Sequence, residues 1–157
     1  MKQERTKTAV WWAVIALTVL FIWGQSLLGR ELSQWQSDSV QGFLGNLLGE
    51  WVYDTFLYRN IRKVAHFAEY ALLGAEWMGY RLSMRGARRP ARWLVCVFGP
   101  AVAVCDELWQ FVSARAPRVT DVLLDCGGYV CGAAAVFGLV WLWRRLRKDS
   151  HKKDLQF

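Results

Sequence analysis

Residues 8–29 read TAVWWAVIALTVLFIWGQSLLG and contain no charged side chain. A helix needs roughly 20 predominantly apolar residues to cross the hydrocarbon core of a bilayer, so this stretch is long enough to span a membrane. Basic residues precede it, which makes a secretory signal peptide the competing interpretation. The apolar run exceeds the usual signal-peptide length of about 7–15 residues, and no small-x-small cleavage pattern follows. We therefore predict an uncleaved first membrane helix.

Three more apolar segments follow, at residues 61–82, 93–114 and 123–143. Tryptophan and tyrosine lie at several of the segment ends, as they do in the aromatic belts of membrane proteins. The chain of 157 residues is 54% hydrophobic and has no internal repeat strong enough to name. The predicted fold is all-α: a single domain over residues 1–157, built as a polytopic membrane bundle of four transmembrane helices.

The region between the first two segments has a different character. Residues 31–40 are polar, and apolar residues such as Phe43, Leu44, Leu47 and Leu48 then recur at helical spacing. This pattern predicts an amphipathic helix at residues 40–56 in the first extracellular loop, lying in the outer membrane interface. A structured loop without membrane contact is the alternative.

The distribution of positive charge predicts which side of the membrane each loop occupies. Most of the 20 lysine and arginine residues lie in three segments: the N-terminus, residues 81–92, and the tail after residue 143. By the positive-inside rule, these three segments face the cytoplasm. We therefore expect a multi-pass protein of the cytoplasmic membrane with both termini cytoplasmic. The net charge of +7 then reflects topology and attraction to anionic lipid, and we expect no nucleic-acid partner.

Polar and ionisable side chains interrupt the apolar segments, and in the predicted topology they all lie in the outer half of the bundle. A charge at membrane depth costs at least about 2.5–3.5 kcal/mol, so such groups are best tolerated where they meet in a shared polar cavity. We predict an outward-facing ligand pocket there. Its predicted lining is Gln25, Ser26, Arg62, Lys63, His66, Glu69, Asp106, Glu107, Gln110, Arg115, Asp121 and Asp125.

Several chemistries remain open for this cluster. It could be a buried ion-pair network that only sets the helix register. If the protein is an enzyme, His66 is the candidate general base, with Glu69 or Asp106 orienting it. One histidine among carboxylates suits manganese or calcium better than zinc. Because nearby arginine and lysine residues can neutralise the acids, we expect no metal and no cofactor. Glu76, which continues the stripe toward the cytoplasm, suggests a proton-coupled transporter as a further alternative.

The fourth segment also contains a close-packing pattern. Gly128 and Gly132 are four residues apart and share a helix face with Asp121 and Asp125. Small residues at this spacing let two membrane helices approach closely. The shared face predicts that these glycines serve packing within the bundle rather than a dimer interface.

Three ordered motifs resemble the signature of VanZ-like integral membrane proteins. They are Arg62-Lys63-x-x-His66-Phe67-x-Glu69-Tyr70, Asp106-Glu107-x-x-Gln110, and Asp121-Val-Leu-Leu-Asp125 followed by Gly127-Gly128. The resemblance covers most of residues 10–140. One departure is local: Ser113-Ala114 replaces the Pro-Gly that family members often have before the arginine at position 115.

The resemblance implies a bacterial membrane protein and a role in the cell envelope. The founding member of the family is associated with low-level resistance to the glycopeptide teicoplanin. We therefore expect the partner to be a membrane lipid, a lipid-linked envelope precursor or a lipoglycopeptide antibiotic. The alternative is a membrane-embedded enzyme that acts on an envelope lipid.

Overall fold

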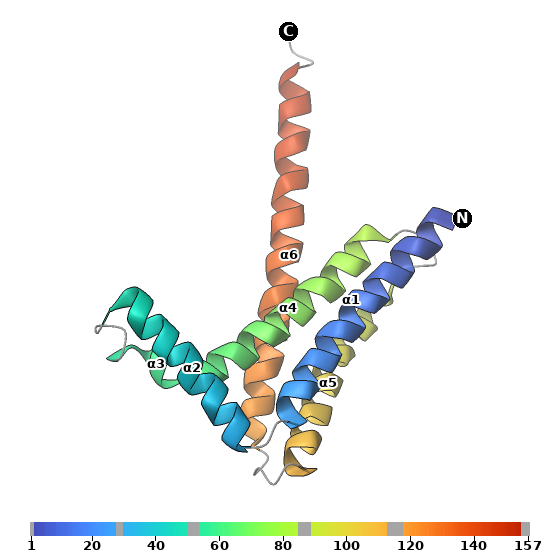
Figure 1. Ribbon diagram of the computed structural model, residues 1–157. Helices are drawn as coiled ribbons and strands as arrows, with labels where there is room; N and C mark the ends of the chain where they lie inside the picture. The colour runs from blue at the N-terminus through green and yellow to red at the C-terminus, as the bar shows by residue number, and fades with distance from the viewer. Residues whose placement is uncertain (1, 28–29, 50–53, 85–88, 113–117, 155–157) are drawn as a thin grey trace.

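The computed structural model describes residues 2–27, 30–49, 54–84, 89–112 and 118–154, and within these ranges the regular structure is entirely helical (Figure 1). The predicted all-α class is therefore confirmed. The helices in chain order are α1 (Lys2–Leu27), α2 (Arg30–Leu48), α3 (Phe56–Arg59), α4 (Ile61–Ser83), α5 (Arg92–Val112) and α6 (Val119–Asp154).

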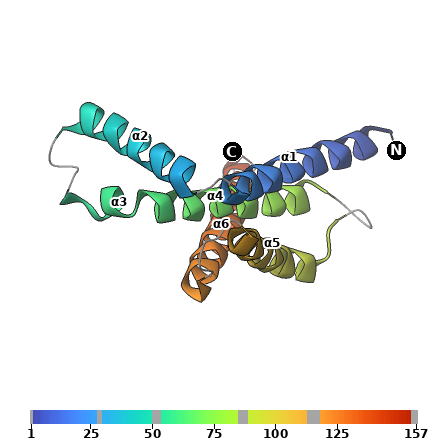
Figure 2. The same cartoon turned by 60° about the horizontal axis from the view of Figure 1, so that its bottom comes forward.

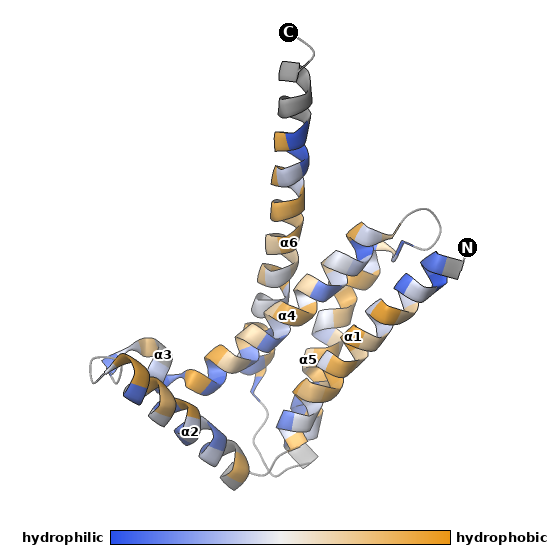
Figure 3. Ribbon diagram, turned by 45° about the horizontal axis from the view of Figure 1, so that its top comes forward, coloured by the Kyte–Doolittle hydropathy of each residue, from blue (hydrophilic) through white to orange (hydrophobic). Residues whose placement is uncertain are grey.

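Two stretches, Gln3–Leu27 in α1 and Val119–Arg147 in α6, are long and apolar enough to cross a membrane. Only 22% of the first apolar window and 28% of the second are buried inside the protein, so neither resembles the core helix of a soluble domain. The middle parts of both helices are predominantly hydrophobic, and hydrophilic residues gather at the ends nearest the two termini (Figure 3). Exposed apolar surface of this extent marks contact with a membrane or with another protein.

The expectation of four membrane helices is met only in part, because in the part of the chain that the structure describes only α1 and α6 are long and apolar enough to cross a membrane. The physical reason lies in the polar residues of α4 and α5. Helix α4 carries Arg62, Lys63, His66 and Glu69 in its first turns, and the end of α5 carries an acidic pair and a glutamine. These residues lower the mean hydropathy of helices that are otherwise long enough to span.

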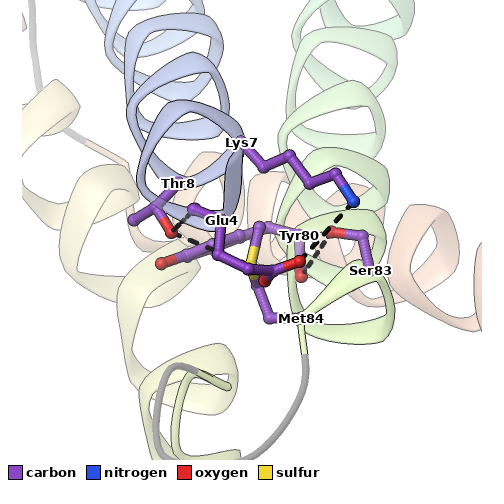
Figure 4. A network of polar contacts seen from close by, with 6 residues as sticks. All are labelled: Glu4, Lys7, Thr8, Tyr80, Ser83 and Met84. Carbon is purple, nitrogen blue, oxygen red and sulfur yellow. Dashed lines mark hydrogen bonds and ion pairs between the residues drawn. The ribbon is translucent and has the colours of Figure 1, made fainter. Parts of the chain in front are cut away.

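Contacts between helices define their relative directions. The start of α1 lies beside the end of α4, where the Thr8 hydroxyl is 3.8 Å from Met84 Sδ (Figure 4). Further along α1, the Thr18 hydroxyl donates to Glu76 Oε1 at 2.8 Å. Helices α1 and α4 are therefore antiparallel.

Helices α5 and α6 are also antiparallel. The Tyr129 hydroxyl of α6 donates to the Val95 carbonyl near the start of α5 at 2.7 Å. At the other end, the Arg118 amide, just before α6, donates to Glu107 Oε2 at 2.9 Å. The C-terminal half of α5 therefore lies beside the beginning of α6.

Helices α4 and α6 make the most extensive contact in the bundle. They cross obliquely, and their chains run in the same general direction (Figure 1). Glycines permit this approach: a Cβ added at Gly132 would overlap the Ala71 carbonyl, and one at Gly128 would overlap the Phe67 carbonyl. The predicted packing role of these two glycines within the bundle is confirmed. Gly74 on α4 completes the contact, because a Cβ there would overlap the Tyr129 carbonyl.

The bundle core combines aliphatic and aromatic side chains from all four long helices. At its centre, Trp77 of α4 is 1% exposed, and its ring centroid lies 4.6 Å from that of Phe98 on α5. The buried apolar residues that surround it include Ile15, Val19, Ile22, Tyr70, Leu73, Tyr80, Val95, Val102, Ala103 and Tyr129. Burial of these side chains holds the four helices together.

Helices α2 and α3 extend away from the region where the four long helices meet (Figure 2). Helix α2 ends at Leu48 and is followed by Gly49, which has a positive φ of 87°. The backbone N–H of Gly49 donates a hydrogen bond to the Gly45 carbonyl, and this forms a left-handed C-terminal cap. The Thr55 side chain caps α3 by accepting from the Tyr58 amide. The amphipathic segment predicted at 40–56 thus overlaps a helix at 30–48, and residues 50–53 lie outside the described part of the chain.

Candidate functional site

The three sequence motifs converge at one end of the bundle. One donor atom each from His66 of α4, Asp106 of α5 and Asp125 of α6 lies within 4.8 Å of the other two. Asp106 is fully buried and Asp125 is 2% exposed. Residues as much as 59 positions apart in the chain are brought together because α4 and α6 pack directly on each other and the end of α5 contacts both.

The beginning of α4 contributes a third carboxylate beside the histidine. His66 Nδ1 lies 3.9 Å from Glu69 Oε2, one turn further along the helix, and both side chains are less than one-fifth exposed. Tyr70 follows on the same face and is fully buried, with its phenol within electrostatic range of Asp106 and Asp125. Tyr70 is absent from the predicted pocket lining, although its spacing of four residues from His66 placed it on the same stripe.

The end of α5 is held by polar contacts on both of its acidic residues. Gln110 Nε2 donates to Asp106 Oδ2 at 3.2 Å, which orients that carboxylate. Glu107 accepts from the Arg118 amide and lies within electrostatic range of the Arg62 guanidinium. The two acids of the Asp-Glu-x-x-Gln motif therefore make different contacts. Asp106 belongs to the cluster, and Glu107 links α5 to the residue before α6.

A cavity of about 610 Å³ opens beside this cluster. Its lining combines positive side chains, carboxylates and amides from α2, α3, α4, α5 and α6. The lining residues are Ser37, Gln41, Arg59, Asn60, Ile61, Arg62, Lys63, His66, Gln110, Arg118, Asp121, Leu124 and Asp125. Six of the predicted pocket residues (Arg62, Lys63, His66, Gln110, Asp121 and Asp125) therefore share one cavity.

Sequence reasoning missed the contribution of the region before α4. Ser37 and Gln41 come from α2, and Gln41 Nε2 donates to the Tyr58 carbonyl at 2.8 Å, which holds α2 over the start of α4. Arg59 and Asn60 lie at the junction of α3 and α4. The sequence pattern shows α2 only as an amphipathic helix, and nothing in it indicates which polar residues reach a cavity.

A second, more apolar cavity of about 470 Å³ lies on the other side of the first turns of α4. Its lining includes Gln25 together with Trp35, Val40, Val64 and Ala68, and it shares Arg62 and His66 with the first cavity. Glu69 also belongs to this second lining. Gln25 is therefore placed near the histidine, but on the opposite side of α4 from Asp125 and Asp121.

The remaining predicted residues have different placements. Ser26 is 1% exposed and belongs to neither cavity lining. Arg115 and the Ser113-Ala114 departure lie outside the described residues. Glu76, for which the sequence indicated no partner, accepts the hydrogen bond from Thr18 in the middle of the bundle.

The residues that form this geometry lie within a region shared with a known protein family. A family model described as VanZ/LLP1 matches residues 8–144, which include all three motifs and all the residues of the cluster. The chain belongs to the VanZ/LLP1 family. Searches of curated proteins and of solved structures gave no significant match. Family membership together with two apolar, largely exposed helices identifies a membrane protein.

The VanZ/LLP1 cluster brings two kinds of chemistry into one small volume. The imidazole and carboxylates of His66, Asp106 and Asp125 can exchange protons or share a cation. The rim formed by Arg62, Lys63 and Arg118 offers the donors that recognise phosphate and carboxylate groups. The arrangement therefore suits an anionic group that enters the cavity from the rim and reaches the buried acids and histidine.

Proposed function

We propose that this VanZ/LLP1 protein binds the head group of an envelope lipid, a lipid-linked envelope precursor or a lipoglycopeptide in its polar cavity. The observation that carries the proposal is the convergence of charged residues from α4, α5 and α6 on one cavity in a protein with large exposed apolar surfaces. Such intramembrane ionisable groups mark functional sites by default, because they are expensive to keep in lipid.

The proposed membrane arrangement has four spanning helices, α1, α4, α5 and α6, in the bacterial cytoplasmic membrane. The antiparallel pairs α1–α4 and α5–α6 support it, since they put the ends of α1 and α5 at the same level as the beginnings of α4 and α6. Most of the lysine and arginine residues then gather at the opposite end, which faces the cytoplasm under the positive-inside rule. Both termini are cytoplasmic and the cavity faces outward.

The two neighbouring cavities suit the two parts of an amphiphile. Arg62, Lys63 and Arg118 in the first would bind a phosphate or other acidic head group. The second cavity is lined mainly by apolar surface, including Trp35, Val40 and Val64, and would accept the beginning of an acyl or isoprenoid chain. Arg62 and the adjoining Ile61 line both cavities, so one ligand can occupy both.

Native mass spectrometry of the full-length protein, extracted with its own lipids, tests this proposal. We expect a retained amphiphile of defined mass, and at least tenfold lower occupancy when Arg62 and Arg118 are both changed to alanine. The matched control is Arg145→Ala, because Arg145 packs over Trp141 near the end of α6, away from the cavity. Equal occupancy in the double variant and the control would refute binding at this cavity.

The link to glycopeptide resistance has its own test. We expect that expression of the protein in a susceptible host raises the minimum inhibitory concentration of teicoplanin, and that the Arg62, Arg118 double variant does not. Vancomycin, which lacks the acyl chain, serves as the comparison antibiotic. An unchanged teicoplanin susceptibility at matched expression would remove the antibiotic from the proposed ligands and leave the envelope lipid.

The second candidate is an enzyme that acts on an envelope lipid. It is favoured by the position of Glu69 Oε2, 3.9 Å from His66 Nδ1 and beside the buried Asp106. This separation is longer than a hydrogen bond, and the carboxylate would orient the imidazole as general base once the contact tightened around a substrate. Labelled membrane lipids incubated with the protein would yield a product that His66→Ala fails to form. Ligand retention without any product between pH 5 and pH 9 would exclude the enzyme.

A further inference from the structure

We infer that His66, Asp106 and Asp125 form a divalent-metal site at the inner end of the polar cavity. Each residue comes from a different helix, and together they present one imidazole nitrogen and two carboxylate oxygens within 4.8 Å of one another. A divalent ion with ligand distances of about 2.0–2.6 Å can bridge donors at such separations after small side-chain movements. From the sequence alone, neutralisation by arginine and lysine was the simpler expectation.

Burial of the two carboxylates is costly unless a cation or a proton neutralises their charge. Asp106 is fully buried and Asp125 is 2% exposed. Two negative charges this close repel each other strongly where water is excluded. Gln110 already orients one oxygen of Asp106. Asp125 Oδ1 is buried and has no hydrogen-bond partner among the residues that the structure describes, and no ion pair joins Asp125 to any of them. This oxygen is available as a ligand.

The donor set selects the class of metal. The sequence pattern of one histidine among many carboxylates suited manganese or calcium, but the cluster itself holds one imidazole and only two carboxylates. Calcium prefers ligand sets made only of oxygen, so this smaller set suits Mn²⁺, with Zn²⁺ as the second candidate. Glu69 lies beside His66 Nδ1 and would orient the ring for coordination through Nε2, as carboxylates do around metal-bound histidines. Three protein ligands leave coordination positions that face the cavity.

The open coordination positions of the metal suggest how the proposed ligand would bind. This part of the inference, unlike the metal site itself, rests on the proposed function. A phosphate-bearing head group held by Arg62 and Lys63 would complete the coordination with its own oxygens. The metal and the basic rim would then recognise the same group from two sides. Metal binding itself does not depend on the identity of that ligand.

The test uses purified full-length protein in detergent, stripped with a chelator and without added lipid. Titration with Mn²⁺ and with Zn²⁺ by isothermal calorimetry should show one site for at least one of them, and its occupancy should raise the unfolding temperature. Asp125→Asn and His66→Ala should weaken binding at least tenfold. In the manganese complex, pulsed electron paramagnetic resonance should detect nitrogen coupling that His66→Ala abolishes.

Glu76→Gln is the matched control, since it also replaces a buried carboxylate, but at a position whose hydrogen bond from Thr18 an amide oxygen can still accept. It should bind metal like the parent. Failure of both metals to bind the parent protein, or equal affinity in Asp125→Asn and the control, would overturn the metal site. Lipid retention in the native mass spectra is measured separately, so the head-group proposal can survive a negative result here.

Discussion

Glu76 shows how one residue acquires a partner only in the folded protein. Its carboxylate lies in the middle of the bundle, is 9% exposed, and accepts a hydrogen bond from the Thr18 hydroxyl across the α1–α4 contact at 2.8 Å. Thr18 lies in an uncharged stretch and has no distinguishing sequence context. The pair supports a structural role for Glu76, because it links α1 to α4 in the middle of the bundle.

We predict that Thr18→Val lowers the free energy of unfolding by about 1–2 kcal/mol, because it leaves a buried carboxyl oxygen without its donor. The change preserves side-chain volume, so packing is not the cause. Denaturation with a graded detergent mixture, followed by tryptophan fluorescence, measures the effect. Thr18→Ser keeps the hydroxyl and should retain most of the stability. A Thr18→Val variant as stable as the parent would mean that Glu76 finds another donor.

At the scale of a single helix, the two halves of α6 have different surroundings. Its first half packs against α4 through glycines, and carries Asp125 to the cluster and Asp121 to the cavity beside it. Its second half extends away from the other helices (Figure 1), with Phe137, Leu139 and Trp141 exposed. Lipid contact accounts for that exposure, and the basic residues that follow would lie at the membrane surface.

Two alanine substitutions in α6 test this division. A Cβ at Gly132 would overlap the Ala71 carbonyl, whereas nothing lies within 4 Å of a Cβ at Gly138. We predict that Gly132→Ala destabilises the protein by about 1–3 kcal/mol through overpacking. Gly138→Ala should be neutral or stabilising by up to about 1 kcal/mol through helix propensity. Thermal unfolding in detergent compares them, and equal melting temperatures would contradict the close α4–α6 contact.

At the scale of the whole molecule, the polar cluster and the start of α1 lie at opposite ends of the bundle. The cluster, both cavities that reach it and helix α2 occupy one end, while the start of α1 and the end of α4 meet at the other (Figures 1 and 4). At that second end, Lys7 pairs with Glu4 and the Thr8 hydroxyl contacts Met84. This separation makes the orientation in the membrane decisive for function.

We predict that single cysteines at Gln34 and Pro117 react with a membrane-impermeant maleimide in intact cells and that cysteines at Ser83 and Ser150 do not. The background would lack the four native cysteines. The reason is the concentration of lysine and arginine in the loop and tail that carry Ser83 and Ser150. Labelling of all four after cell lysis is the control. Labelling at Ser83 but not at Gln34 would move the cavity to the cytoplasm and remove the outward-facing site.

Much of this architecture can be predicted from local patterns. The uncharged run at residues 8–29 indicates a membrane helix because length and apolarity alone decide insertion. The glycines at 128 and 132 indicate close packing because only side-chain size is involved. The three ordered motifs around His66, Asp106 and Asp121 were together sufficient to indicate the family. Each of these depends on a few neighbouring residues.

The sequence by itself determined the helical class and the family and indicated candidate site residues, because each follows from composition or from spacing along one helix. Only the tertiary structure decided that His66, Asp106 and Asp125 meet within 4.8 Å, that Gln25 faces a different cavity, and that Gln41 closes α2 over the site. Those facts depend on where helices cross and how far each is rotated. Crossing points are set by packing between residues far apart in the chain, which no local pattern encodes.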